Sequence, residues 1–144
     1  MKKQIDRSLS TSEKEVEGLI SRFEKGELER LPGQTLKETF ELQVMNELAK
    51  ARDRAGEIVD NQLTLDNAGI IMTRTGARGS SLNIGQMMGC IGQQAIRGKR
   101  IMRGYADRTL PHFKPNDPRP EARGFVYSCY REGLNPIEFF FHSM

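Results

Sequence analysis

The chain has 144 residues, of which 37% are hydrophobic and none is Trp, so it can form one modest domain or two very small ones that support each other. No apolar run approaches the length of a membrane span, and residues 1–10 are too polar for a signal peptide, so we expect a soluble cytoplasmic protein without membrane partners. Residues 1–60 carry 11 Lys/Arg against 13 Asp/Glu, whereas residues 61–144 carry 11 against 6. This basic C-terminal part suits polyanions such as nucleic acid, or is simply a solvated basic face.

A helical hairpin is predicted for the first part of the chain. Ser12 with Glu15 has the form of a capping box, and apolar residues follow at helical spacing up to Gly26, where the helix would stop: Val16, Leu19, Ile20 and Phe23. Thr35 with Glu38 forms a second box, followed by a longer apolar stripe: Phe40, Val44, Leu48, Ala51, Ala55 and Ile58 or Val59. Because the linker is short, the two helices should pack antiparallel, either as plain support or as a contact surface.

A turn-rich basic stretch, Thr73 to Ser81, follows the apolar residues 70–72. Gly76 and Gly79 allow backbone conformations that a Cβ would hinder. Together with Arg74 and Arg78, the exposed amides could hold an anion at the start of a following helix. The Gly-Lys-Ser/Thr ending of a Walker A loop is absent, which excludes that type of phosphate loop.

Residues 81–96 are predicted as a third helix of unusual composition, because Gly85, Gly89 and Gly92 interrupt it. Each interior glycine costs about 1 kcal/mol relative to alanine, so something should approach this helix closely. Tight packing against another helix is one explanation. A polar surface that lines a cavity is the other, which we prefer because four amide side chains accompany the glycines: Asn83, Gln86, Gln93 and Gln94.

Residues 97–123 form a basic segment with eight Lys/Arg against three acidic residues: Arg97, Lys99, Arg100, Arg103, Arg108, Lys114, Arg119 and Arg123. Its four prolines exclude a long helix, and its interleaved aromatic residues are compatible with nucleic-acid binding. Cys90 and Cys129 lie 39 residues apart with neither a Cys-x-x-Cys pair nor a neighbouring His. We therefore predict buried, reduced thiols and no zinc site.

The C-terminal residues announce a helix, with Asn135 at the N-cap, Pro136 at N1 and Glu138 at N3. Three adjacent phenylalanines follow, and the chain then stops at Met144. A helix of two turns is marginal in water, and three phenylalanines need burial on more than one side. We expect that this helix is truncated and continues in a longer protein.

Six blocks, in this order, closely resemble the largest subunit of multisubunit DNA-directed RNA polymerases: Thr75–Ser80, Gly92–Gln94, Gly98–Ile101, Arg108–Phe113, Glu121–Val126 and Gly133–His142. The archaeal form, in which that subunit is split into two chains, looks most similar. The resemblance implies a mainly α fold, with an antiparallel helical hairpin and then a small helical and irregular module, truncated at a helix start. Residues 1–66 would be the funnel hairpin, residues 67–134 the pore-lining module with its basic segment, and residues 135–144 the start of the bridge helix.

In this family the funnel surrounds a secondary channel, through which nucleotides enter and backtracked RNA leaves, and a transcript-cleavage factor docks there. The region under the bridge helix, which receives the amanitin toxin in eukaryotic relatives, lines the pore. The resemblance implies pore-lining or nucleotide- and RNA-contacting roles for eight residues: Arg78, Asn83, Gln86, Cys90, Gln93, Gln94, Lys99 and Arg100. Lys99 and Arg100, followed by Arg78, are the first choices for attracting triphosphates.

The Asp-Phe-Asp-Gly-Asp loop that holds the catalytic magnesium in this family is absent from these 144 residues. The resemblance therefore implies that the intact subunit is a magnesium-dependent nucleotidyltransferase, whereas this chain has no catalytic residue or cofactor and is inactive alone. Implied partners are the rest of the largest subunit, the other polymerase subunits, template DNA, RNA and nucleotides. The alternative is a stand-alone basic nucleic-acid-binding or regulatory module that uses residues 97–123.

Overall fold

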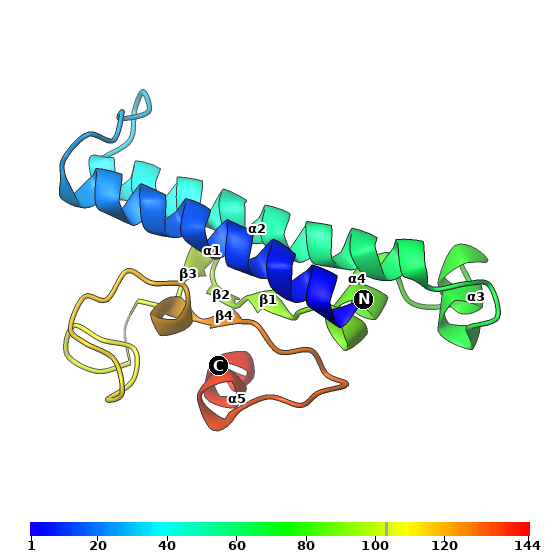
Figure 1. The fold of residues 1–144 in the computed structure, drawn as a ribbon. Coiled ribbons are helices and arrows are strands. Elements are labelled where there is room, and N and C mark those ends of the chain that lie inside the picture. Colours follow the sequence, from blue (N-terminus) through cyan, green and yellow to red (C-terminus); the bar gives the residue numbers. More distant parts are fainter. Residues whose placement is uncertain (103) are drawn as a thin grey trace.

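The computed structural model describes residues 1–102 and 104–144, so Arg103 of the basic segment lies outside the described residues. Two long antiparallel helices, α1 (Lys2–Glu24) and α2 (Leu36–Gln62), lie side by side, and the rest of the chain packs along one side of them (Figure 1). The other elements are short helices and two-residue strands. The predicted mainly α class and the antiparallel hairpin are therefore confirmed.

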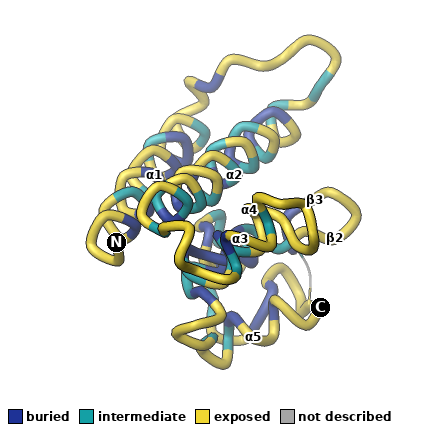
Figure 2. Tube along the Cα trace, turned by 90° about the vertical axis from the view of Figure 1, so that its right-hand side faces the viewer, coloured by how far each residue is buried: buried dark blue, intermediate teal, exposed yellow. Residues whose placement is uncertain are grey.

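The core of the hairpin is the apolar stripe predicted for α2. All six of its main positions are buried, namely Phe40, Val44, Leu48, Ala51, Ala55 and Val59. They face buried residues of α1. In Figure 2 the buried residues of both helices appear dark blue on their inner sides. Near the connecting loop Phe23 stacks on Phe40, with ring centroids 4.4 Å apart. Cys90 and Phe125 from the following module join the same core, so the module is packed onto the hairpin.

The predicted start of α1 is wrong, because the helix begins at Lys2 and not at Ser12. Ser12 is buried in mid-helix, and its Oγ accepts a hydrogen bond from Nη1 of Arg54 at 3.4 Å. Ile5 and Leu9 continue the apolar spacing toward the N-terminus, and both are buried against the hairpin core. Burial of a further helical face outweighs the local capping signal.

The second capping box is confirmed. Oγ1 of Thr35 accepts a hydrogen bond from the amide of Glu38 at 3.2 Å, and Oε2 of Glu38 accepts one from the amide of Thr35 at 2.8 Å. Two amides that the first turn of α2 would leave without partners are thus satisfied.

Replacing Thr35 with alanine is expected to lower the free energy of unfolding by about 1 kcal/mol, because one capping acceptor is lost. Urea denaturation followed by circular dichroism measures this change. Thr11→Ala is the control, because the Thr11 hydroxyl only donates to the carbonyl of Arg7 within α1, at 2.9 Å. An equal loss in both variants would show that the cap is not the cause.

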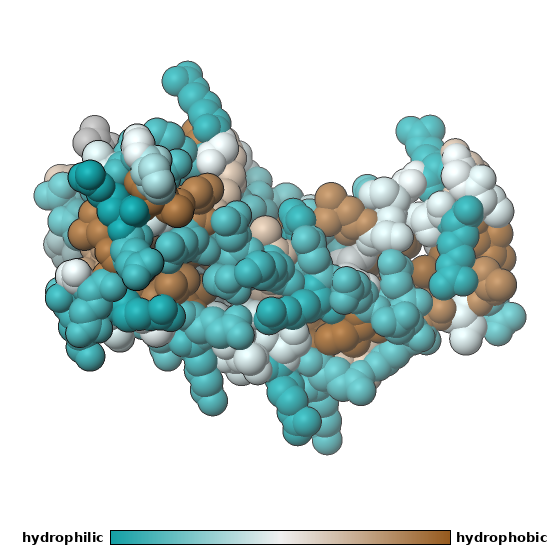
Figure 3. All heavy atoms as spheres, turned by 90° about the horizontal axis from the view of Figure 1, so that it is seen from above, coloured by the Kyte–Doolittle hydropathy of each residue, from teal (hydrophilic) through white to brown (hydrophobic). Residues whose placement is uncertain are grey.

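Beyond the hairpin, a helix that was not predicted, α3 (Ala68–Arg74), starts at Asn67, whose side chain accepts from the amide of Gly69 at 2.9 Å. The next helix, α4 (Ser81–Met88), ends before Gly89, so the predicted helix over 81–96 is correct only in its first half. The described helices include none that is long and apolar enough to cross a membrane. Seen from above, hydrophilic side chains cover most of the molecule. Apolar ones gather at the two ends of the view, with smaller patches between them (Figure 3).

After α4 the chain forms two antiparallel strand pairs. Strand β1 (Gly92–Gln93) pairs with β4 (Phe125–Val126), with Gly92 opposite Val126. Strands β2 (Ala95–Ile96) and β3 (Lys99–Arg100) form a hairpin around Arg97 and Gly98, which have φ angles of 52° and 76°. The twist of such a turn matches the natural twist of paired strands. Residues 92–100 therefore form short strands, and residues 92–96 do not continue the predicted helix.

The C-terminal helix α5 (Pro136–Ser143) begins as predicted, with Asn135 as its cap. It follows the short 3-10 helix η1 (Glu121–Arg123), β4 and a loop. Only one of its three phenylalanines is buried: Phe141 joins a second small core with Ile101 and Leu110, whereas Phe139 and Phe140 are 58% and 56% exposed. The expectation that all three need burial is therefore met only by Phe141 within the described residues.

Candidate functional site

The eight candidate residues lie in the segment that passes beneath α2, from the loop before α4 to β3. Helix α4 packs beside Gly56 of α2, Gly92 of β1 lies near Arg52, and Arg100 of β3 reaches Glu41. These positions of α2 are spread over about 20 Å along the helix axis. The structure therefore arranges the candidates along the hairpin and does not gather them in one pocket.

Arg100 is buried, and its guanidinium makes three hydrogen bonds within the chain. Its Nε and Nη2 donate to the two carboxylate oxygens of Glu41 at 2.7 and 2.9 Å, and its Nη1 donates to the carbonyl of Pro118 at 3.1 Å. The guanidinium also lies over the ring of Phe40, 5.9 Å from its centroid. Arg100 thus fastens both β3 and the basic segment to α2, and its side chain leaves no free donor face for a phosphate.

Cys90 is 1% exposed and belongs to the hairpin core. Burial raises the pKa of its thiol from the usual 9.0 to about 12. Cys129 is also buried and unpaired, which confirms the prediction of two buried free thiols. The structure gives Cys90 a packing role in this chain.

The stability of the chain is expected to fall as the pH rises from about 9 toward about 12, because the Cys90 thiol ionises in this range only when unfolded. The pKa of Tyr127 is also raised, by burial and by the nearby carboxylate of Glu13, which adds a loss of the same sign. Urea midpoints at neutral and alkaline pH, compared between the parent chain and Cys90→Ala, measure the thiol's share. An alkaline loss of equal size in Cys90→Ala would contradict the assignment.

Gln93 and Gln94 tie the short strands to their neighbours. Nε2 of Gln93 donates to the carbonyls of Gln94 and Arg123 at 2.7 and 2.8 Å. Oε1 of Gln94 lies 3.4 Å from Nδ1 of His142, and Nε2 of that ring lies 3.2 Å from the hydroxyl of Tyr130. Because the oxygen of Gln94 can only accept, Nδ1 of His142 is the donor. These polar contacts link the residue after β1 to α5, a role for His142 and Tyr130 that sequence reasoning missed.

Arg78 and Asn83 are exposed near the start of α4, and Oδ1 of Asn83 accepts from the Ser80 hydroxyl at 2.5 Å. Gln86, half-buried on α4, donates from Nε2 to the carbonyl of Ile91 at 3.4 Å. A hollow of about 190 Å³ lies beside Gln86, between α2 and α4. These three side chains remain available on the surface or at the edge of a hollow.

The glycines of α4 serve close packing, the first of the two explanations considered. A Cβ on Gly85 would lie 3.2 Å from the Cα of Gly56 on α2. A Cβ on Gly89 would lie 2.7 Å from the carbonyl oxygen of Gly85 and 3.3 Å from that of Ala55. The two helices therefore approach backbone to backbone at this point, and a hollow opens beside the contact.

Three cations of the basic segment are held internally. Arg100 pairs with Glu41, Arg119 pairs with Asp117 at 2.7 Å, and Nε of Arg123 donates to the carbonyl of Asp117 at 2.7 Å. Four of the eight Lys/Arg in this segment are exposed and form no ion pair among the described residues: Arg97, Lys99, Arg108 and Lys114. This reduces the charge that a stand-alone nucleic-acid-binding module could use.

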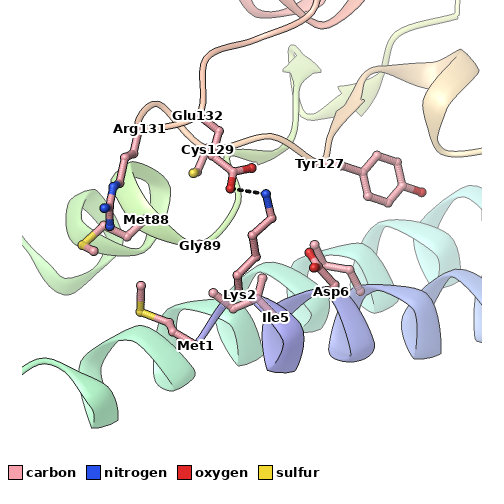
Figure 4. Close-up of a pocket in the computed structure, with 11 residues that line it drawn as sticks. Met1, Lys2, Ile5, Asp6, Met88, Gly89, Tyr127, Cys129, Arg131 and Glu132 are labelled. Atoms are coloured by element: carbon pink, nitrogen blue, oxygen red, sulfur yellow. Dashed lines mark ion pairs between the residues drawn. The ribbon is translucent and has the colours of Figure 1, made fainter.

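A separate hollow of about 320 Å³ lies between the start of α1 and the loop after β4 (Figure 4). Nζ of Lys2 pairs with Oε1 of Glu132 across it at 2.5 Å, and Cys129 lies at its wall. No grouping of three or more His, Cys, Asp or Glu suited to a metal ion occurs in residues 1–102 and 104–144.

The sequence of the chain is similar to a known protein family and to individual known proteins. A family model described as RNA polymerase Rpb1, domain 4, matches residues 20–126. The chain is 51% identical over 143 residues to DNA-directed RNA polymerase subunit Rpo1N of Halobacterium salinarum, covering 99% of this chain and 15% of that subunit. It is 54% identical over 141 residues to the subunit of Halococcus morrhuae, covering 98% and 40%. For Methanothermobacter thermautotrophicus the identity is 51% over 144 residues, covering 99% and 17%. The chain thus spans a minor part of each of these relatives.

Proposed function

The chain belongs to the RNA polymerase Rpb1 domain 4 family, and we propose that it forms the funnel and the adjoining pore wall of a DNA-directed RNA polymerase. The observation that carries this proposal is 51% identity to Rpo1N over nearly the whole chain, hairpin and module included. In the proposal residues 1–66 form the funnel, residues 67–134 the pore-lining module and residues 135–144 the first turns of the bridge helix.

The geometry supports a wall more than a reaction centre. Arg100 and Cys90 hold the wall together from inside, because both side chains are buried. The candidates that keep accessible polar groups face the channel in this proposal: Arg78, Asn83, Gln86, Gln94 and Lys99. Gln93 supports the wall instead, because its Nε2 donates to two backbone carbonyls and its Oε1 is buried. Cations such as Lys99 raise the local concentration of triphosphates, and the amides offer uncharged hydrogen bonds that do not trap them.

Catalysis in this proposal belongs to aspartates and magnesium held by other parts of the subunit. The partners are the rest of the largest subunit, the other polymerase subunits, template DNA, RNA and nucleotides, with a transcript-cleavage factor on the funnel. Binding to DNA then occurs only within the assembled enzyme, in the cytoplasm.

Neutralising the two exposed channel cations tests the wall role. In an archaeal polymerase whose matching segment is exchanged for residues 1–144, the double variant Arg78→Met/Lys99→Met should raise KM for nucleotides several-fold at low salt, with kcat little changed. The effect should shrink as salt is added.

The matched control is Lys3→Met/Lys25→Met, which removes the same charge from exposed positions at the two ends of α1. An equal rise of KM in both double variants would show that the effect comes from the overall charge of the chain and not from these two positions. An unchanged KM in Arg78→Met/Lys99→Met would contradict the proposal that these two side chains face the channel.

A further inference from the structure

Helix α2 carries a second apolar stripe that the hairpin does not use. Leu42, Met45 and Ala49 follow one another at positions i, i+3 and i+7. They lie about 150° around the helix from the buried stripe of Phe40 and Val44. Leu42 is 41% exposed, and Met45 and Ala49 are half-buried. A helix that is apolar on two faces normally covers both of them.

This second stripe is the floor of a hollow of about 550 Å³. Its other wall is the turn between β2 and β3, with Gly98, Lys99 and Met102. The wall is fixed to α2 by the bidentate ion pair between Arg100 and Glu41. The groove is therefore preformed and rigid, which lowers the entropic cost of binding.

The charges around this groove leave a small excess of cations, because Lys37, Lys99 and Arg100 face only Glu38 and Glu41. Glu41 is occupied by Arg100, and the carboxylate of Glu38 accepts from the amide and the hydroxyl of Thr35 at 2.8 Å each. Lys37 and Lys99 are exposed and form no ion pair among the described residues. An occupant must bring apolar groups for the floor and negative charges for the rim.

We propose that this groove docks an amphipathic helix of a protein partner, whose apolar stripe lies on Leu42, Met45 and Ala49 and whose flanking carboxylates meet Lys37 and Lys99. A helix fits because side-chain ridges spaced at i, i+3 and i+7 accept the ridges of a second helix. Nucleic acid satisfies the cations but offers the apolar floor no matching stripe. The proposal concerns a contact surface and does not depend on catalysis by the polymerase.

The test uses the full chain and two fluorescein-labelled helical peptides with the same leucine stripe, one flanked by glutamates and the other by lysines. Fluorescence anisotropy should show saturable binding of the glutamate peptide and about ten-fold weaker binding of the lysine peptide. Leu42→Gln and Lys37→Met/Lys99→Met should each weaken binding of the glutamate peptide several-fold. Circular dichroism checks that each variant keeps its helical content.

Leu65→Gln is the control for Leu42→Gln, because Leu65 is an exposed leucine, at 59%, outside the groove. Equal affinity for both peptides, or an equal loss in Leu65→Gln, would overturn the proposal. A third result would also overturn it: the chain binds neither peptide but self-associates, and Leu42→Gln abolishes the self-association. The occupant of the groove would then be a second copy of the chain. Displacement of the peptide by an RNA oligonucleotide would assign the rim to nucleic acid instead.

Discussion

Replacing Arg100 with methionine is expected to lower the free energy of unfolding by about 3 kcal/mol, because it leaves the Glu41 carboxylate without its partner. The Arg100 side chain has no exposed surface, and that of Glu41 has 19%. This remaining access to water places the effect at the low end of the range for broken buried ion pairs. Urea denaturation of the full chain measures the change.

Two variants separate the ion pair from general damage. Lys50→Met removes an exposed pair on the same helix, with Glu47 at 2.6 Å, and should cost less than about 1 kcal/mol. Arg100→Met/Glu41→Leu replaces both charges with apolar groups and should recover part of the loss. A double variant less stable than Arg100→Met would contradict the account, because the unpaired carboxylate would then not be the cause.

Replacing Glu138 with alanine is expected to cost about 3 kcal/mol, because its buried carboxylate accepts three backbone hydrogen bonds. Oε2 accepts from the amide of Asn135 at 3.1 Å, and Oε1 accepts from the amides of Tyr127 and Ser128 at 3.0 and 3.1 Å. One side chain thus caps α5 and fastens it to the chain that leaves β4. The loss is measured as a shift of the urea midpoint.

Glu38 provides a matched control, because it holds the same N3 position in the capping box of α2. Its carboxylate is exposed and makes hydrogen bonds only to Thr35. Glu38→Ala should therefore cost clearly less than Glu138→Ala. Equal losses would mean that the bonds to Tyr127 and Ser128 contribute nothing beyond the cap.

Sequence patterns predicted correctly those parts of the fold that depend only on residues close together in the sequence. The box at Thr35, the stop at Gly26 and the cap at Asn135 are all present, because each needs only a few consecutive residues. The start of α1 was misjudged because the burial of Ile5 depends on packing against α2. Residues 89–96 were misjudged because the pairing of Gly92 with Val126 joins segments far apart in sequence.

The candidate site shows the same division. Sequence reasoning placed Arg100 among free cations, and the partner that buries it lies 59 residues away on α2. A weak signal was present, because Glu41 follows Phe40 directly at the edge of the buried stripe. The link from Gln94 to His142 spans 48 residues and had no local signal. Residue type indicated which side chains matter, but only tertiary packing separates anchors from accessible groups.

The most direct test of the central claim, that this chain is a wall segment of a polymerase, is template-dependent RNA synthesis after segment exchange. An archaeal polymerase that carries residues 1–144 in place of its matching segment, with full subunit assembly verified, should synthesise RNA at a rate close to that of the parent enzyme. The isolated chain should incorporate no nucleotide with magnesium present. An assembled but inactive chimera, or nucleotide incorporation by the isolated chain, would contradict the account.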